Sequence, residues 1–138
     1  MTASAIKLSM TPEEAAACGM VIALHAEVAP DRPAILSPLG DRTYAALNAR
    51  SNQLVRALRS AGLKEGDAVA LLCANRPEFV ETCVALSRCG MRLTPINWHL
   101  TAEEIGYIVE NCEAKSFIAD ARFAEKAEEV SAVSPHLV

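Results

Sequence analysis

The chain has 138 residues, of which 51% are hydrophobic, 22% charged and only 4% aromatic. This balance is typical of one globular domain with an aliphatic core and leaves little room for long disorder. The net charge of −4, together with the lack of a basic stripe, argues against nucleic acid as a partner.

Two further sequence classes can be set aside. The longest apolar run, residues 15–24, is too short for a transmembrane helix, which needs about 20 residues. No charged segment followed by an apolar one opens the chain, so no secretory signal is indicated. The five cysteines are odd in number and never spaced as C-x-x-C, which favours neither zinc nor a disulfide framework. We expect reduced thiols, no metal site and a cytoplasmic location.

The first predicted element is one helix within residues 1–30. Thr11 suits the N-cap position, Pro12 the first helical position, and Glu14 completes a capping box. The helix should end before Pro30. Residues 33–43 then predict a short extended segment, a turn at residues 39–41 and a return.

The clearest helical pattern spans residues 43–62. Leu47, Val55 and Leu58 fall on one face, and Gly62 suits the position after the helix. Residues 68–74 follow as a continuous apolar run. Continuous hydrophobicity is typical of a strand that is buried on both faces, as in parallel sheets.

The remaining chain alternates helices and strands. Asn75 and Glu78 are spaced as the capping box of a helix that ends at Gly90, and Thr101 and Glu104 as that of a second helix. Strands are predicted at 91–97 and 115–120, and a last helix at 121–133. Residues 134–138 resemble a turn that enters a new strand.

The fold class predicted from this order is α/β, with a partial, open parallel sheet flanked by helices. We expect residues 1–138 to form a single α/β unit, with the leading helix in residues 1–30 and a β-α-β-α-β-α region in residues 31–138. The unfinished strand at the end indicates an incomplete N-terminal fragment of a larger protein.

Open parallel sheets bind ligands at the carboxyl ends of their strands. The loops predicted there are residues 74–77, 96–99 and 119–121. None is a glycine-rich phosphate loop, and neither a nucleophile motif nor a metal motif is present. We therefore assign no catalytic residue and no metal ligand.

Asn97, Trp98 and His99 stand directly before the Thr101 cap, on the side of the sheet where ligands are expected. Two interpretations remain open at this point. Trp98 could cover a helix while His99 is solvated, or the pair could contact a ligand.

Residues 31–120 together resemble the start of the adenylate-forming (AMP-binding) acyl-CoA synthetase family. The resemblance depends on the order and spacing of small marks rather than on one motif. The marks are Thr43-Tyr44 with Leu47, Gly62-Leu63, Gly66-Asp67, Val69-Ala70, Asn75, Glu78-Phe79, Gly90, Pro95-Ile96-Asn97 and Leu100. The resemblance implies the N-terminal subdomain of that fold. It also implies a parent enzyme that uses ATP and Mg²⁺ to convert a carboxylic acid, such as a fatty acid, into an acyl-adenylate and then into a CoA thioester.

The family's phosphate loop, its Tyr-Gly-x-Thr-Glu element, its ribose-binding Asp and its C-terminal Lys have no counterpart in this sequence. The chain therefore resembles only about the first quarter of a family member, and alone it should be inactive. Smaller departures are Ala46, where an acid is frequent, and Ala74, where proline is frequent. His99 takes the place of a family Arg that lies near the CoA phosphates, which implies a CoA-side role. Neutral imidazole binds phosphate more weakly than guanidinium does.

Three hypotheses follow for the whole protein. The first is an acyl-CoA ligase whose remaining chain is this unit's main partner, with carboxylic acid and CoA as small-molecule partners. The second is a stand-alone, non-catalytic α/β binding module whose exposed apolar surface favours a homodimer. The third is a related adenylate-forming enzyme, for example one that loads a carrier-protein thiol or oxidises the adenylate; the sequence does not separate it from the first.

Overall fold

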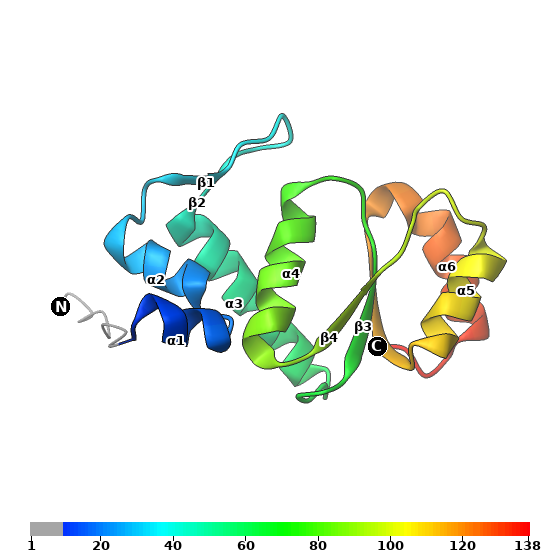
Figure 1. The fold of residues 1–138 in the computed structure, drawn as a ribbon. Coiled ribbons are helices and arrows are strands. Elements are labelled where there is room, and N and C mark those ends of the chain that lie inside the picture. Colours follow the sequence, from blue (N-terminus) through cyan, green and yellow to red (C-terminus); the bar gives the residue numbers. More distant parts are fainter. Residues whose placement is uncertain (1–9) are drawn as a thin grey trace.

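The computed structural model describes residues 10–138 (Figure 1). Helices and strands alternate after a helical N-terminal region. The helices are α1 (Pro12–Ala17), α2 (Val21–Val28), α3 (Tyr44–Ser60), α4 (Pro77–Cys89), α5 (Ala102–Asn111) and α6 (Ala124–Val133), with a 3₁₀ turn η1 (Ala121–Phe123). The strands are β1 (Pro33–Ile35), β2 (Arg42–Thr43), β3 (Ala68–Leu72), β4 (Arg92–Pro95) and β5 (Ala114–Ala119).

The main sheet has three parallel strands in the order β4-β3-β5. Ala68 of β3 lies opposite Arg92 of β4 on one side and opposite Ala114 of β5 on the other. Helix α4 connects β3 to β4, and α5 connects β4 to β5. The predicted α/β fold with a parallel sheet flanked by helices is therefore confirmed.

Strand β3 is buried along its whole length, as its continuous hydrophobicity predicts. Its side chains alternate between two cores, because successive residues of a strand point to opposite faces. Val69 packs with α3 and α4 through Val55, Leu58 and Leu86. Ala70 and Leu72 pack on the other face with α5 and α6, in a cluster that contains Ile105, Val109 and Val130. The molecule is a sheet between two helical layers (Figure 1).

The prediction of one leading helix is wrong, because the described part of that segment forms two helices. Thr11 and Glu14 make the predicted capping box of α1. The helix ends at Ala17 with Cys18 as its C-cap, and Gly19 takes a φ of +70°, a left-handed conformation that favours glycine. A Cβ atom at Gly19 would lie 2.7 Å from the carbonyl oxygen of Ser87 in α4. The chain reverses here because glycine alone permits this close packing. Residues 1–9 of the predicted segment lie outside the described residues.

The extended segment and turn predicted after α2 form an antiparallel hairpin of β1 and β2. Thr43 caps α3 through a hydrogen bond that its hydroxyl accepts from the Ala46 N–H. Gly62 follows the helix with a φ of +93°, as expected for a residue after a helix end.

The capping box predicted at Asn75 is wrong, whereas the one at Thr101 is confirmed. Arg76 is the N-cap of α4 and makes no side-chain cap bond, and Asn75 is exposed. The carboxylate of Glu78 binds arginines instead. Thr101 and Glu104 make both bonds of the box at the start of α5.

Residues 134–138 form a turn but no strand. The Val138 N–H nevertheless donates a hydrogen bond to the Lys115 carbonyl at the free edge of β5 (3.0 Å). Among residues 10–138, no helix is long and apolar enough to cross a membrane. All five cysteines are free thiols.

The packing at Gly19 predicts that a single added methyl group, in Gly19→Ala, lowers the stability of the fold strongly. Gly62→Ala should lower the free energy of unfolding by about 1–2 kcal/mol, because only the left-handed backbone resists it and nothing lies within 4 Å. Gly19→Ala should cost about 1–3 kcal/mol more, because its Cβ would also clash with the Ser87 carbonyl. Urea unfolding of both variants measures the difference. Equal losses would show that the Ser87 contact is unimportant.

Candidate functional site

The three loops predicted to follow the strands lie together at one edge of the sheet (Figure 1). They gather there because the strands are parallel and all end on the same side. From β3 the chain proceeds to β4 on one side, and from β4 it crosses to β5 on the other side of β3. Such a reversal of direction leaves a crevice between the carboxyl ends of β3 and β5. Open α/β sheets bind ligands at this position.

A cavity of about 260 Å³ occupies this crevice between β3, β5 and the start of α4. Its walls are mainly apolar, and its polar groups come from the loops and from the first turns of α4. The residues that define it include Leu71, Cys73, Arg76, Glu78, Ile118 and Asp120. An apolar pocket with a few convergent charges is the usual form of a small-molecule site.

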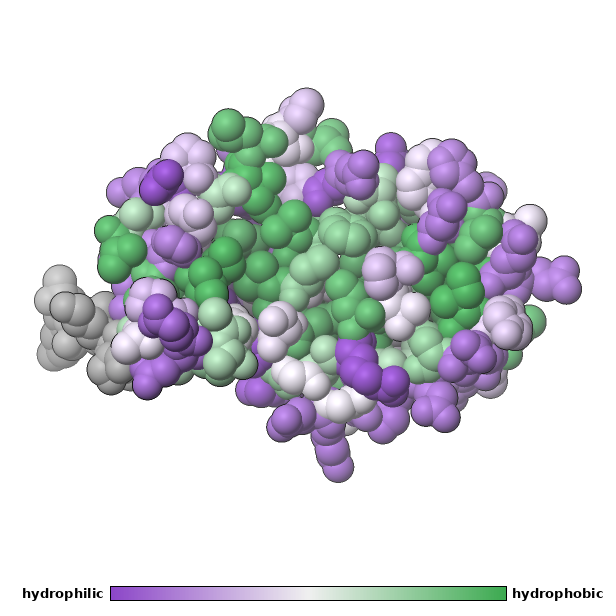
Figure 2. Space-filling model, viewed as in Figure 1, coloured by the Kyte–Doolittle hydropathy of each residue, from purple (hydrophilic) through white to green (hydrophobic). Residues whose placement is uncertain are grey.

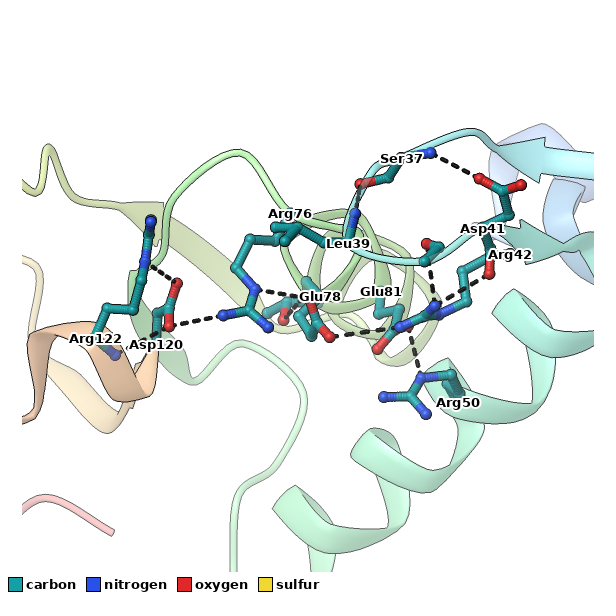
Figure 3. A network of polar contacts seen from close by, with 12 residues as sticks. Ser37, Leu39, Asp41, Arg42, Arg50, Arg76, Glu78, Glu81, Asp120 and Arg122 are labelled. Carbon is teal, nitrogen blue, oxygen red and sulfur yellow. Dashed lines mark hydrogen bonds and ion pairs between the residues drawn. The ribbon is translucent and has the colours of Figure 1, made fainter.

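An ion pair crosses the crevice from α4 to the end of β5 (Figure 3). Arg76 Nη1 lies 3.0 Å from Asp120 Oδ1, and the Asp120 side chain is only 1% exposed. The Arg122 backbone N–H donates to the same oxygen (3.1 Å), and the Arg122 side chain lies 3.4 Å from Oδ2. Burial alone would raise the pKa of Asp120, but the Arg122 N–H and the Arg76 guanidinium outweigh it and lower that pKa.

The ion pair continues into a network that reaches the hairpin and α3 (Figure 3). Arg76 Nε donates to Glu78 (3.1 Å), which Arg42 also approaches at 3.4 Å. Arg42 and Arg50 each place Nε 2.7 Å from one oxygen of Glu81, whose side chain is 9% exposed. The carboxylates along this row are all paired with arginines, so the network positions its members.

Cys73 lines the same cavity in surroundings that disfavour its thiolate form. Burial raises its pKa, and the nearby Asp120 carboxylate acts in the same direction. Only the thiolate is a good nucleophile or metal ligand. Among residues 10–138, no cluster of three or more His, Cys, Asp and Glu side chains could hold a metal ion.

His99 lies exposed at the same edge of the sheet, in the loop between β4 and α5. Its ring stacks on Trp98 with centroids 3.6 Å apart, and the Trp98 ring also stacks on Phe123 at 5.6 Å. The Asn97 side-chain oxygen accepts a hydrogen bond from the His99 backbone N–H (3.0 Å). The Trp98 ring therefore packs on Phe123 of η1, while His99 keeps an open face.

Lys126 of α6 holds this loop through two hydrogen bonds to its backbone. Its Nζ donates to the carbonyl oxygens of Trp98 (2.9 Å) and Leu100 (2.7 Å). The loop is thus held by packing on Phe123 and by two charge-assisted hydrogen bonds. His99 is consequently presented by a fixed backbone.

Sequence reasoning placed Arg76 and Asp120 in loops at the correct edge but did not identify them as partners. An aspartate directly after a strand and an arginine before a proline are the only signals in the sequence. Their pairing depends on β3 and β5 being neighbours in the sheet. Lys126 was missed altogether, because helical periodicity says nothing of its backbone partners.

The Asp120 ion pair predicts a specific pH dependence. A carboxyl group whose folded pKa lies below its usual 3.8 stabilises the fold at higher pH and loses this contribution as pH falls through the folded value. Asp120→Asn should therefore be less stable than the wild type at pH 7, and the difference should shrink progressively below about pH 4.

Guanidinium unfolding between pH 7 and pH 2 measures this difference. The exposed Asp31, changed to Asn, is the matched control and should leave the pH profile unchanged. A difference between wild type and Asp120→Asn that is constant with pH would contradict the ion-pair account.

Comparison with known proteins identifies similar chains. Residues 22–137 match the model of the family described as AMP-binding enzyme. A fatty acid–[acyl-carrier-protein] ligase of Streptomyces coeruleorubidus is 32% identical over 114 residues, which are 83% of this chain and 22% of that protein. Long-chain fatty acid transport protein 2 of Rattus norvegicus is 34% identical over 107 residues, which are 77% of this chain and 17% of that protein.

Solved structures give the same picture. The Mycobacterium tuberculosis fatty acyl CoA synthetase superposes with a TM-score of 0.75 at 31% identity, covering 80% of this chain and 22% of that one. An anthranilate CoA ligase in complex with anthranoyl-AMP has a TM-score of 0.81 at 24% identity, over 87% of this chain and 23% of that one, which shows a shared fold. The chain thus spans about a fifth of the length of the relatives it matches.

Proposed function

Because the chain belongs to the AMP-binding enzyme family, we propose that it is the N-terminal part of an acyl-CoA ligase. The parent activates a carboxylic acid, such as a fatty acid, with ATP to an acyl-adenylate and transfers the acyl group to the thiol of CoA. The observation that supports this most strongly is the match of residues 22–137, joined to a common fold with a fatty acyl CoA synthetase.

The role of this unit in the parent is mainly that of a scaffold. Acyl-adenylate formation needs cations and backbone donors around the transferring phosphate, together with a closing movement that admits the thiol. The loops at the carboxyl edge contain no glycine-rich cradle. ATP and Mg²⁺ would therefore be held by the remaining chain, and the 138 residues alone would be inactive.

The one residue that we propose on the CoA side is His99. Its imidazole is exposed, stands at the ligand-binding edge and is presented by a loop that Asn97 and Lys126 fix. An imidazole donates one hydrogen bond to a phosphate, whereas Arg donates two and is always charged. His99 would thus contribute modestly to CoA affinity.

His99→Ala in the full-length parent should raise the KM for CoA about two- to tenfold, because one hydrogen bond to a charged group is lost. The acid-dependent ATP–pyrophosphate exchange should not change, because adenylate formation precedes CoA binding. His99→Arg should lower the KM for CoA below that of the wild type. Unchanged CoA kinetics in both variants would show that His99 is only a solvated side chain that does not contact CoA.

A carrier-protein thiol is the second candidate acceptor, favoured by the similarity to a fatty acid–[acyl-carrier-protein] ligase. A stand-alone binding module, which could form a homodimer through its exposed apolar surface, is the non-catalytic alternative. We propose a reducing compartment such as the cytoplasm for each of these proteins, because the five cysteines are odd in number and never spaced as C-x-x-C.

The experiment that tests the ligase proposal begins with the gene beyond the codon for Val138. We expect it to encode a Thr/Ser/Gly-rich loop that ends in Pro-Lys, and we expect the full-length product to catalyse exchange between ATP and pyrophosphate when a fatty acid is present. The 138-residue chain serves as the control and should show no exchange. A stop codon directly after Val138, with cooperative unfolding of the purified chain, would instead support the binding module.

A further inference from the structure

The β1–β2 hairpin projects beyond the body of the molecule, on the side where the strands of the sheet end (Figure 1). Residues 33–40 of the hairpin carry no charge. Leu36 is 76% exposed and Leu39 is 56% exposed. Figure 2 shows hydrophobic surface on this projection, at the top of the view. Two large aliphatic side chains in water at a protruding tip suggest an interaction surface.

Several backbone groups of the tip are bound by side chains and carbonyls of the hairpin itself. The Ser37 N–H donates to Asp41 Oδ1 (2.8 Å), the Leu39 N–H to Ser37 Oγ (3.1 Å), and the Gly40 N–H to the Ser37 carbonyl (2.9 Å). Arg42 Nη1 donates to the carbonyls of Gly40 and Asp41 (3.2 and 3.1 Å). Unsatisfied polar backbone is what prevents most loops from entering an apolar medium. These bonds lower the cost of moving the tip out of water.

The base of the hairpin is fixed to the body. Arg42, which caps the tip carbonyls, also binds the buried carboxylate of Glu81 on α4 at 2.7 Å, and its side chain is only 14% exposed. The two leucines are therefore presented in a set orientation, so that little conformational freedom remains to be lost on binding.

We propose that this tip inserts Leu36 and Leu39 into the boundary between head groups and acyl chains of a lipid surface. Two leucines offer far less area than the roughly 800 Å² per partner of a stable protein interface. Shallow insertion into a fluid surface needs no complementary partner. Asp41 follows the tip directly and limits the depth.

The charge of the chain indicates which lipid head groups the tip would bind. With a net charge of −4 and an uncharged tip, binding rests on apolar contact rather than on attraction to anionic lipid. Zwitterionic vesicles should therefore be bound at least as well as anionic ones, and salt should have little effect. A ligase bound to lipid would meet long-chain acids in the bilayer. This benefit to the enzyme rests on the proposed function, whereas the binding of the tip to vesicles does not.

Co-sedimentation of the 138-residue chain with phosphatidylcholine vesicles at millimolar lipid tests the proposal. The wild type should sediment with the vesicles, and the double variant Leu36→Ser/Leu39→Ser should bind at least about tenfold more weakly. Val133→Ser, which changes an equally exposed aliphatic side chain on α6, is the matched control and should bind like the wild type. Both leucines are exposed, so folding of the double variant should be intact, as circular dichroism would verify.

The depth of insertion can be measured in a Trp98→Phe background. Leu39→Trp should shift its emission to the blue and be quenched by brominated acyl chains, while Val133→Trp should do neither. A wild type that stays in the supernatant, or equal binding by the wild type and the double variant, would overturn the proposal. It would also be overturned by a dimer that the double variant loses without any vesicle binding, since the leucines would then serve a protein contact. These readouts do not depend on ligase activity.

Discussion

The five consecutive buried residues of β3 constrain every layer of the molecule. Because the strand has neighbours on both edges and helices on both faces, each side chain must be apolar and compact. Val69 fixes the distance to α3 and α4, whereas Ala70 and Leu72 fix the distance to α5 and α6. The carboxyl edge, with its crevice and its three loops, is a consequence of this arrangement. A polar residue in β3 would disturb the core that its side chain faces.

A second constraint joins the N-terminal region to the sheet. Glu81 would be costly to bury alone, and it is tolerated because Arg42 from the hairpin and Arg50 from α3 converge on one of its oxygens. The hydroxyl of Ser51 also donates to the Glu81 backbone carbonyl (3.2 Å). The same group of contacts therefore orients α3 and the hairpin on α4. Stability, the direction of the hairpin and the geometry of the crevice are coupled through one row of alternating charges (Figure 3).

Local rules predicted most of the fold, because capping boxes and hydrophobic periodicity involve residues within a few positions of one another. They failed where a distant group decided the outcome. Glu78 does not close a box with Asn75, since Arg42 and Arg76 bind its carboxylate. Gly19 interrupts the first helix because α4 packs against it. In the candidate site, the edge and the loops were predictable from the alternation of strands and helices. The ion pair between Arg76 and Asp120 was not, because it exists only once β3 and β5 are side by side.

The strand order also governs how the molecule can assemble. In sequence, the β3–β5 pairing is roughly twice as distant as the β3–β4 pairing, with α4, β4 and α5 all intervening. The short hairpin and the β3–α4–β4 unit close smaller loops and meet a lower entropic barrier. Until β5 docks, the Ala70 and Leu72 face of β3 stays open to water, and with it an unpaired strand edge. During synthesis on the ribosome, the chain therefore exposes this apolar face and this unpaired edge, which favour aggregation, until α5 and β5 have been synthesised.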